Sequence, residues 1–230
     1  MPPDPLDVMS SSSSSRAVPV DVGGWAATIL SYGVNPLVFP PLVYGLVLYH
    51  VGAPPMDVAW GAGIGLLFLG LVPLAHVSWM RLRGDIGSLE IRDRRKRTEP
   101  FLVVLGAGLV AFGVVVQSEV VGHALLAALV GCHVLNTVLL FVITTWWKIS
   151  VHCASVAGAV ATLAFMRVHV PGIVFGAGAT GSLLLGLGGL LVPVLIWARV
   201  RSDAHTPAQA VAGTVLGGVA PYLELWLVVA

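Results

Sequence analysis

Seven long apolar stretches divide the chain, and they constrain its fold more than any other feature. They cover about residues 25–50, 58–80, 101–117, 120–146, 151–166, 173–197 and 208–228. A helix needs about 20 apolar residues to cross the hydrocarbon core of a bilayer. Only 10% of the residues are charged, whereas soluble domains have about a quarter. The sequence therefore predicts an all-α protein, a polytopic membrane bundle of about seven transmembrane helices.

The domain organisation follows from the same pattern. Residues 1–24 are rich in proline and serine and lack an apolar core of signal-peptide length, which predicts a disordered or surface-lying tail. Residues 25–230 form a single predicted transmembrane domain. Pro36, Pro40 and Pro41 interrupt its first stretch, and we expect a kink or a partly re-entrant segment there.

Small and polar residues inside the apolar stretches predict how the helices pack. Glycines recur at four-residue spacing, for example in "GTVLGG" at 213–218, and such glycines allow helix backbones to approach closely. Cys132 and Cys153 lie in or beside apolar runs, which favours buried free thiols over a disulfide. His76, His123, His133 and Asn136 are expected to bond neighbouring helices, whereas Glu224 fits either the bundle interior or an interface.

The cations predict the topology. If all seven stretches span, the N-terminal tail and the junctions at 81–100, 147–152 and 198–207 share one side of the membrane. That side holds 11 of the 12 Lys and Arg residues, and only Arg167 lies opposite. Cytoplasmic loops carry an excess of Lys and Arg. We therefore expect a cytoplasmic N-terminus and an outside C-terminus.

Three polar clusters lie on this predicted cytoplasmic side, and each precedes a membrane helix. They read "RDRRKRTEP" at 92–100, "KISVH" at 148–152 and "RVRSDAHTPAQ" at 199–209. Ser150 is a plausible N-cap for one helix, and Thr206 followed by Pro207 for another. Helix N-termini that lie beside cations favour phosphate binding. His152 and His205, close to such a phosphate, suggest a nucleophile and a general acid.

The second and third clusters resemble signatures of the type 2 phosphatidic acid phosphatase (PAP2) superfamily. The third cluster, with Arg199, His205 and Gln209, resembles SRxxxxxHxxxD, and "ISVH" at 149–152 resembles PSGH. In the first cluster, Arg92, Glu99 and Pro100 stand at the Lys, Arg and Pro positions of KxxxxxxRP. Ala198 and Gln209 stand where the family carries serine and aspartate. The resemblance implies that six of the seven helices form a PAP2-like core.

The resemblance also implies a role for each candidate site residue. His205 would attack phosphorus to give a phosphohistidine, and His152 would protonate the leaving alkoxide. Gln209 would orient His205, although an amide cannot supply the negative charge of an aspartate. The substrate would be bound by Arg199, Lys148, Ser150, Arg94 and Arg97. Cations and helix ends would stabilise the transition state, so no metal or other cofactor is expected.

The expected function is hydrolysis of a lipid phosphate or diphosphate, polyprenyl or phosphatidate-like, at the cytoplasmic interface. The expected partners are this lipid and the bilayer, with no nucleic acid. Two alternatives remain. One is a membrane prenyltransferase, in which Asp85 and Asp93 would belong to a magnesium site, although such enzymes need a second Asp-rich loop and none follows. The other is a non-catalytic lipid-binding protein that lost turnover when aspartate became Gln209.

Overall fold

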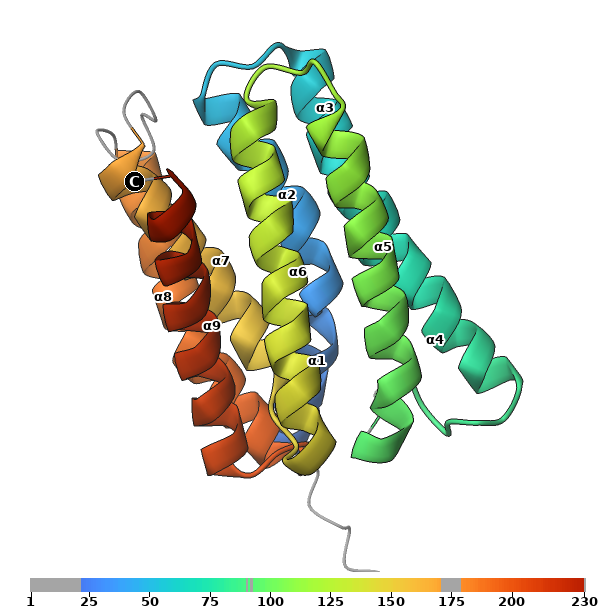
Figure 1. Cartoon of the computed structure of the whole chain (residues 1–230). Helices are drawn as coiled ribbons and strands as arrows, with labels where there is room; N and C mark the ends of the chain where they lie inside the picture. Colours follow the sequence, from blue (N-terminus) through green and yellow to red (C-terminus); the bar gives the residue numbers. More distant parts are fainter. Residues whose placement is uncertain (1–21, 90, 92, 171–178, 230) are drawn as a thin grey trace, which may run out of the picture.

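In the computed structural model, residues 22–89, 91, 93–170 and 179–229 are described (Figure 1). All regular structure within these residues is helical, which confirms the predicted all-α class. The helices are α1 (Val22–Gly33), α2 (Phe39–His50), α3 (Pro55–Ile64), α4 (Val72–Leu82), α5 (Thr98–Val116), α6 (His123–Trp146), α7 (Val151–His169), α8 (Ala179–Arg201) and α9 (Pro207–Val229). Short turns η1 (Pro36–Val38) and η3 (Arg94–Arg97) precede α2 and α5, and a π-helical segment, η2 (Gly65–Leu71), joins α3 to α4.

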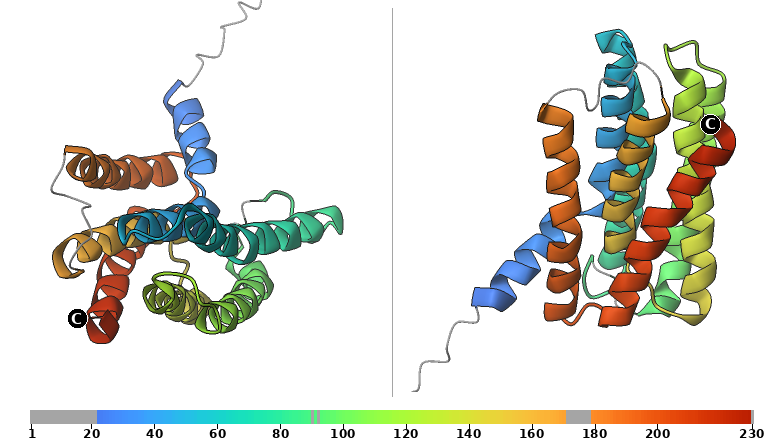
Figure 2. Two further views of the ribbon diagram at one scale, coloured as in Figure 1. Left: turned by 90° about the horizontal axis from the view of Figure 1, so that it is seen from above. Right: turned by 90° about the vertical axis from the view of Figure 1, so that its left-hand side faces the viewer.

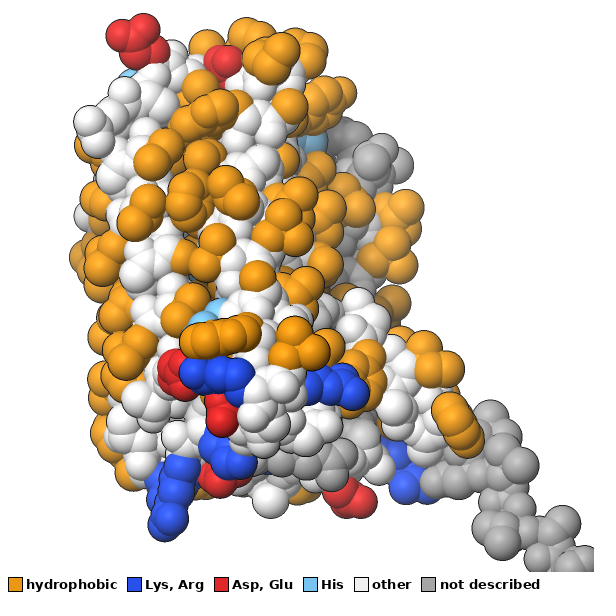
Figure 3. All heavy atoms as spheres, turned by 90° about the vertical axis from the view of Figure 1, so that its right-hand side faces the viewer, with side chains coloured by type: hydrophobic (Ala, Val, Ile, Leu, Met, Phe, Trp, Pro, Cys, Tyr) orange, Lys and Arg blue, Asp and Glu red, His pale blue; other side chains and the backbone are white. Residues whose placement is uncertain are grey.

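Seven helical segments of the described chain are long and apolar enough to cross a membrane, as predicted. They are Gly23–His50, Pro55–Leu82, Arg94–Val116, His123–Trp146, Val151–His169, Gly181–Arg201 and Pro207–Val229. Large apolar side chains such as Leu109, Leu190 and Leu227 are exposed on the outer surface of the bundle. Figure 3 shows such side chains along the height of one face, with the Lys and Arg side chains gathered near one end. The chain is therefore an integral membrane protein.

The first spanning segment bends where its prolines lie. Helix α1 ends at Gly33, and the Oδ1 atom of Asn35 accepts a hydrogen bond of 3.0 Å from the Leu37 amide at the start of η1. Helix α2 begins immediately afterwards. Figure 2 shows α1 leaning out of the bundle. It packs against α8, and this contact becomes important at the site.

One end of the bundle collects the predicted cationic junctions. Helix α1 and the connections α4–α5, α6–α7 and α8–α9 lie at this end, whereas the last helix finishes at the other (Figure 1). We call it the basic end. Its assignment to the cytoplasm remains a prediction. Residues 1–21, which make up most of the predicted tail, and residues 171–178, which include the start of the predicted sixth stretch, lie outside the described residues.

Helices α7 and α9 pack closely because glycines face the contact. A Cβ atom built on Gly213 would lie 2.4 Å from the Ser150 carbonyl oxygen, and one on Gly217 only 2.0 Å from that of Ala154. A larger residue at either position would force the two helices apart. The predicted role of the four-residue glycine spacing is thus found at this interface, and it sets the first turns of α7 and α9 side by side.

A polar pair inside the bundle connects α6 to α9. The Asn136 side-chain amide donates to the Glu224 carboxylate over 2.6 Å and to the Cys132 carbonyl oxygen over 2.8 Å. Glu224 thus faces the bundle interior, a choice that the sequence left open. Cys132 and Cys153 are both buried and free, as expected.

Candidate functional site

His205 is placed by the way α8 ends. The amides of Ala204 and His205 both donate to the Arg199 carbonyl oxygen over 3.1 Å, which folds the chain back onto the last turn of α8. Asp203 adopts a left-handed conformation with φ of 53°, as is common for the residue that closes a helix. The residues from Arg199 to His205 therefore form the C-terminal cap of α8. This cap brings the His205 backbone next to that of Arg199. The His205 side chain is buried.

Gln209 orients His205 while it also caps α9. The Gln209 Oε1 atom accepts hydrogen bonds from the Thr206 amide and from His205 Nδ1, both of 3.2 Å, and the Gln209 amide donates to Thr206 Oγ1. This reciprocal pair is a capping box. A carbonyl oxygen only accepts, so His205 Nδ1 carries the proton. The lone pair of His205 is consequently on Nε2.

His152 lies in the first turn of α7, next to the start of α9. Ser150 caps α7, since its hydroxyl accepts from the Cys153 amide, as the sequence predicted. The Ser150 amide in turn donates to the Gln209 carbonyl oxygen over 3.2 Å. His152 is close enough to interact electrostatically with Arg199, His205 and Arg97. The hydrogen bond between Ser150 and Gln209 thus brings His152 and His205 near each other at the basic end.

Lys148 ties the two junctions together. Its Nζ atom donates to the Ala204 carbonyl oxygen over 2.6 Å, and the side chain is half-buried. Its positive charge also acts on His205. The junction before α7 and the junction before α9 therefore form one structure around the imidazoles.

Arg199 is the largest fully buried side chain among the described residues and is only 1% exposed. Its Nη1 atom donates to Ser31 Oγ of α1 over 2.8 Å, and Ser31 is itself buried. Helix α1 thereby holds the guanidinium of α8 in place. Sequence reasoning missed Ser31, because a lone serine in an apolar helix has no distinguishing pattern.

The cationic loop contributes unequally to this site. Arg97 donates to the carbonyl oxygens of Ile91 and Ile149, over 2.9 Å and 3.3 Å, and acts electrostatically on both imidazoles. Arg94 instead donates to the Thr145 carbonyl oxygen near the end of α6. Arg92 lies outside the described residues. The structure therefore brings Arg97 to the histidines, whereas the contact of Arg94 is with α6.

The local electrostatics keep His205 neutral. Burial, and after it the positive charges of Arg199, Lys148 and Arg97, lower the pKa of His205 from 6.5 to about 3. The hydrogen bond to Gln209 opposes this shift only in part. The imidazole is therefore neutral at neutral pH, and its Nε2 atom is free to act as a base or nucleophile. We call Lys148, His152, Arg199 and His205 the histidine site.

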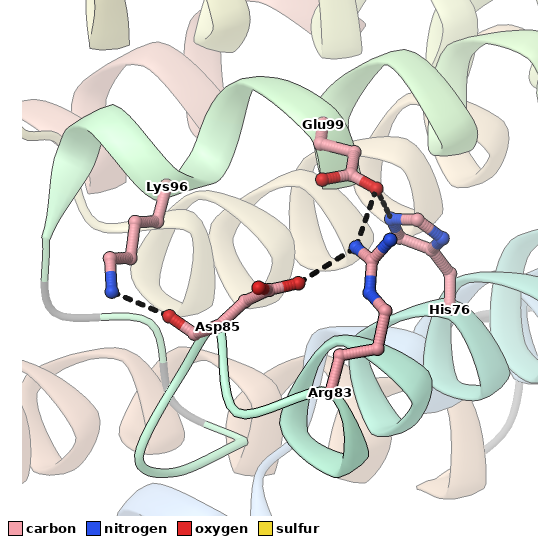
Figure 4. Close-up of polar contacts among 5 residues, drawn as sticks. All are labelled: His76, Arg83, Asp85, Lys96 and Glu99. Atoms are coloured by element: carbon pink, nitrogen blue, oxygen red, sulfur yellow. Dashed lines mark hydrogen bonds and ion pairs between the residues drawn. The ribbon is translucent and has the colours of Figure 1, made fainter.

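A second polar cluster at the basic end differs from the histidine site (Figure 4). Arg83 pairs with Asp85 over 2.8 Å and with Glu99 over 3.3 Å, and His76 meets the same Glu99 oxygen. We call these four residues the ion-pair cluster. Arg83 also lies over the Trp79 ring, 3.7 Å from its centre, and Lys96 donates to the Asp85 carbonyl oxygen. The carboxylates here are largely exposed and already paired with cations.

The acidic residues considered for a magnesium site are engaged in other contacts. Asp85 pairs with Arg83, and the Asp93 carboxylate accepts a hydrogen bond from the Arg95 amide at the start of η3. Within the described residues, no group of three or more His, Cys, Asp or Glu side chains is placed to hold a metal ion. Glu99, which aligns with the arginine of the first family signature, belongs to the ion-pair cluster.

Comparison of the chain with known protein families, with curated proteins and with solved structures finds no match.

Proposed function

We propose that the protein is a lipid phosphatase, a divergent relative of the PAP2 superfamily, which hydrolyses a lipid phosphate or diphosphate at the basic end of the bundle. One observation supports this most strongly. Two imidazoles and a buried arginine, which come from α7, α8 and the connection between α8 and α9, lie together at the basic end of the bundle. Among the described residues, the charged groups that act on His205 are the cations Arg199, Lys148 and Arg97, which suits a doubly charged phosphate.

The proposed first step transfers the phosphoryl group to His205. The Nε2 lone pair attacks phosphorus while the bond from phosphorus to the lipid oxygen breaks. His152 takes up a proton as the phosphate dianion binds, because the anion offsets the positive charges of Arg199 and Arg97 that act on the free imidazole, and it then donates this proton to the departing oxygen. Arg199, Lys148 and Arg97 stabilise the charge that spreads over the phosphoryl oxygens.

The proposed second step releases phosphate. Water attacks phosphorus, the bond from phosphorus to Nε2 breaks, and His152 takes up the proton that the water loses. His205 returns to its neutral form, with Nδ1 still bonded to Gln209. Because Gln209 has no negative charge, it orients the imidazole without stabilising a cation. The oxygens of the bound phosphate would have to supply that charge.

The membrane position fits a substrate with an apolar tail. The tail of a polyprenyl or phosphatidate-like lipid stays in the bilayer, while its phosphate reaches the histidine site at the helix ends. The predicted orientation places this end in the cytoplasm. The absence of a metal requirement remains part of the proposal.

The test is phosphate release by purified protein in detergent from a panel of polyprenyl and diacylglycerol phosphates, with EDTA present. We expect release from at least one lipid, and loss of release in a His205→Ala variant. Activity that requires magnesium would favour the prenyltransferase alternative. Lipid binding without release, also after Gln209→Asp, would favour the non-catalytic alternative.

A further inference from the structure

A cavity of about 190 Å³ lies within the bundle, between α2, α5, α6, α7 and α9. Helices α6 and α7 follow each other in the chain but make few direct contacts with each other. Helix α6 packs on α5 and α9, whereas α7 packs on α9, α8 and α2. The cavity occupies the space that this arrangement leaves between α6 and α7.

The cavity begins beside the histidine site and extends into the bundle along α7. Val151 and Ser155 line it, and His152 lies between them in the first turn of α7. Thr162 lines its far part, and its position along α7 is about 16 Å from that of Val151 at the usual helical rise. This depth is roughly half of the ~30 Å hydrocarbon core. An occupant could therefore extend from the interface through one leaflet.

The chemistry of the walls favours an apolar occupant. Most lining residues are aliphatic, aromatic or proline, among them Leu69, Phe101 and Leu140. Two of the polar lining residues of α6 have partners within the protein, since Asn136 donates both of its amide hydrogens and the Thr137 hydroxyl donates to a backbone carbonyl, whereas His133 adds a polar ring to the wall. An engineered cavity of about 150 Å³ binds benzene, so this one holds a segment on the order of eight carbon atoms.

We propose that this cavity binds the part of one hydrocarbon chain nearest to the phosphate, in a lipid whose phosphate lies between His152 and His205. The inference rests on the proposed function, because the histidine site defines where the chain begins. Its volume accepts one chain only, so the second chain of a two-chain lipid would remain in the bilayer. The cavity then recognises the chain next to the phosphate and leaves the distal part unrestricted.

The test uses decyl phosphonate, whose carbon–phosphorus bond is not an ester and is not hydrolysed as one. A photoreactive diazirine on its chain records by mass spectrometry which residues the chain touches. We expect labels on the lining residues of α6 and α7, such as Leu140 and Ala159, and none on the outward-facing Leu109 of α5. Labels confined to outward-facing residues would overturn the proposal, and this result requires no variant.

Two matched variants test the same point by affinity. Ala159→Phe fills the cavity, whereas Ala164→Phe adds the same ring on α7 at a half-buried position that does not line it. We expect Ala159→Phe to weaken decyl phosphonate binding roughly 100-fold, the loss that follows when about three to four methylenes lose apolar contact. Ala164→Phe should bind as the wild type does. Equal binding by both folded variants would contradict the proposal.

The two proposals can fail separately. If the chain labels the cavity but no lipid phosphate is hydrolysed, the cavity assignment stands and the phosphatase assignment falls. If lipid phosphates are hydrolysed and the label lies outside the cavity, the phosphatase assignment stands alone. A parallel experiment with a diazirine-labelled decanol tests whether the chain enters the cavity without the phosphonate. We expect the decanol to label the lining residues much less than decyl phosphonate does.

Discussion

The histidine site and the ion-pair cluster lie at the same end of the bundle, yet their charges are arranged in opposite ways. In the histidine site, Arg199 and His205 are buried, and the charges of described residues that act on His205 are positive. In the ion-pair cluster, Arg83 is more exposed and contacts two carboxylates. Exposed pairs of this kind contribute about 0–1 kcal/mol to stability. Burial and sign of charge thus separate a candidate anion site from a surface network with similar residues.

The largest expected difference between the two regions lies in their histidines. His205→Ala should lower phosphate release by at least about 1,000-fold, because it removes the nucleophile. The matched variant His76→Ala removes an imidazole that meets Glu99 in the ion-pair cluster, and its activity should stay within about twofold of wild type. Steady-state phosphate release measures both. Equal losses would mean that burial and charge do not identify the site.

The arginines give the next contrast. Arg199→Lys retains the charge but loses the planar guanidinium, and we expect kcat to fall about 100-fold. Arg83→Lys should leave kcat unchanged, since its charge is used in exposed pairs. The comparison requires both variants to elute as folded monodisperse protein. A normal kcat in Arg199→Lys would exclude this guanidinium from the transition state.

Substitutions at two adjacent glycines of α9 test whether the packing of α7 on α9 positions the histidine site. Gly217→Ala places a methyl group against the Ala154 carbonyl oxygen and should shift α7 from α9, with a loss of about 1–3 kcal/mol in the free energy of unfolding. The resulting misalignment of His152 and His205 should cost up to about 100-fold in activity. Gly218→Ala meets open space and should be neutral. Unfolding in detergent and phosphate release distinguish them, and identical behaviour would argue against this packing.

A pH dependence of stability, which does not involve catalysis, is also expected at the histidine site. The pKa of His205 is about 3 when folded, against 6.5 for the free side chain. As pH falls below 6.5, the unfolded chain binds a proton that the folded protein does not, so stability decreases down to about pH 3. His205→Gln should reduce this decrease. Melting temperatures at pH 7 and pH 4 measure it, and an unchanged decrease in the variant would show that His205 is not the cause.

The fold was more predictable than the details of the site. The length of each apolar stretch predicts the membrane-spanning helices directly, because a helix must have about 20 apolar residues to cross the bilayer. Glycine spacing predicted close helix packing at residues 213–218, without its partner, and helix-cap patterns predicted the roles of Ser150 and Thr206, since these are local rules. The capping box was also readable, because Thr206 and Gln209 match its spacing, but Gln209 was interpreted only through its likeness to a family aspartate.

Contacts between residues far apart in the chain could not be predicted from the sequence. Ser31 reaches Arg199 only because α1 leans against α8, and Asn136 meets Glu224 only because α6 packs on α9. The different contacts of the arginines in the cationic loop also depend on the three-dimensional packing of the helices. Arg97 and Arg94 are three residues apart, but the turn of η3 directs one toward Ile149 and the other toward α6.

The most direct measurement is the mapping of a covalent phosphoryl group on the protein. A short reaction with the preferred lipid phosphate, quenched in alkali because phosphohistidine is labile to acid, is followed by peptide mass spectrometry. We predict one phosphohistidine, at His205 and on Nε2, which is absent from His205→Ala and present in His76→Ala. Phosphate release without any phosphorylated His205, or phosphorylation of another residue, would contradict the proposed mechanism.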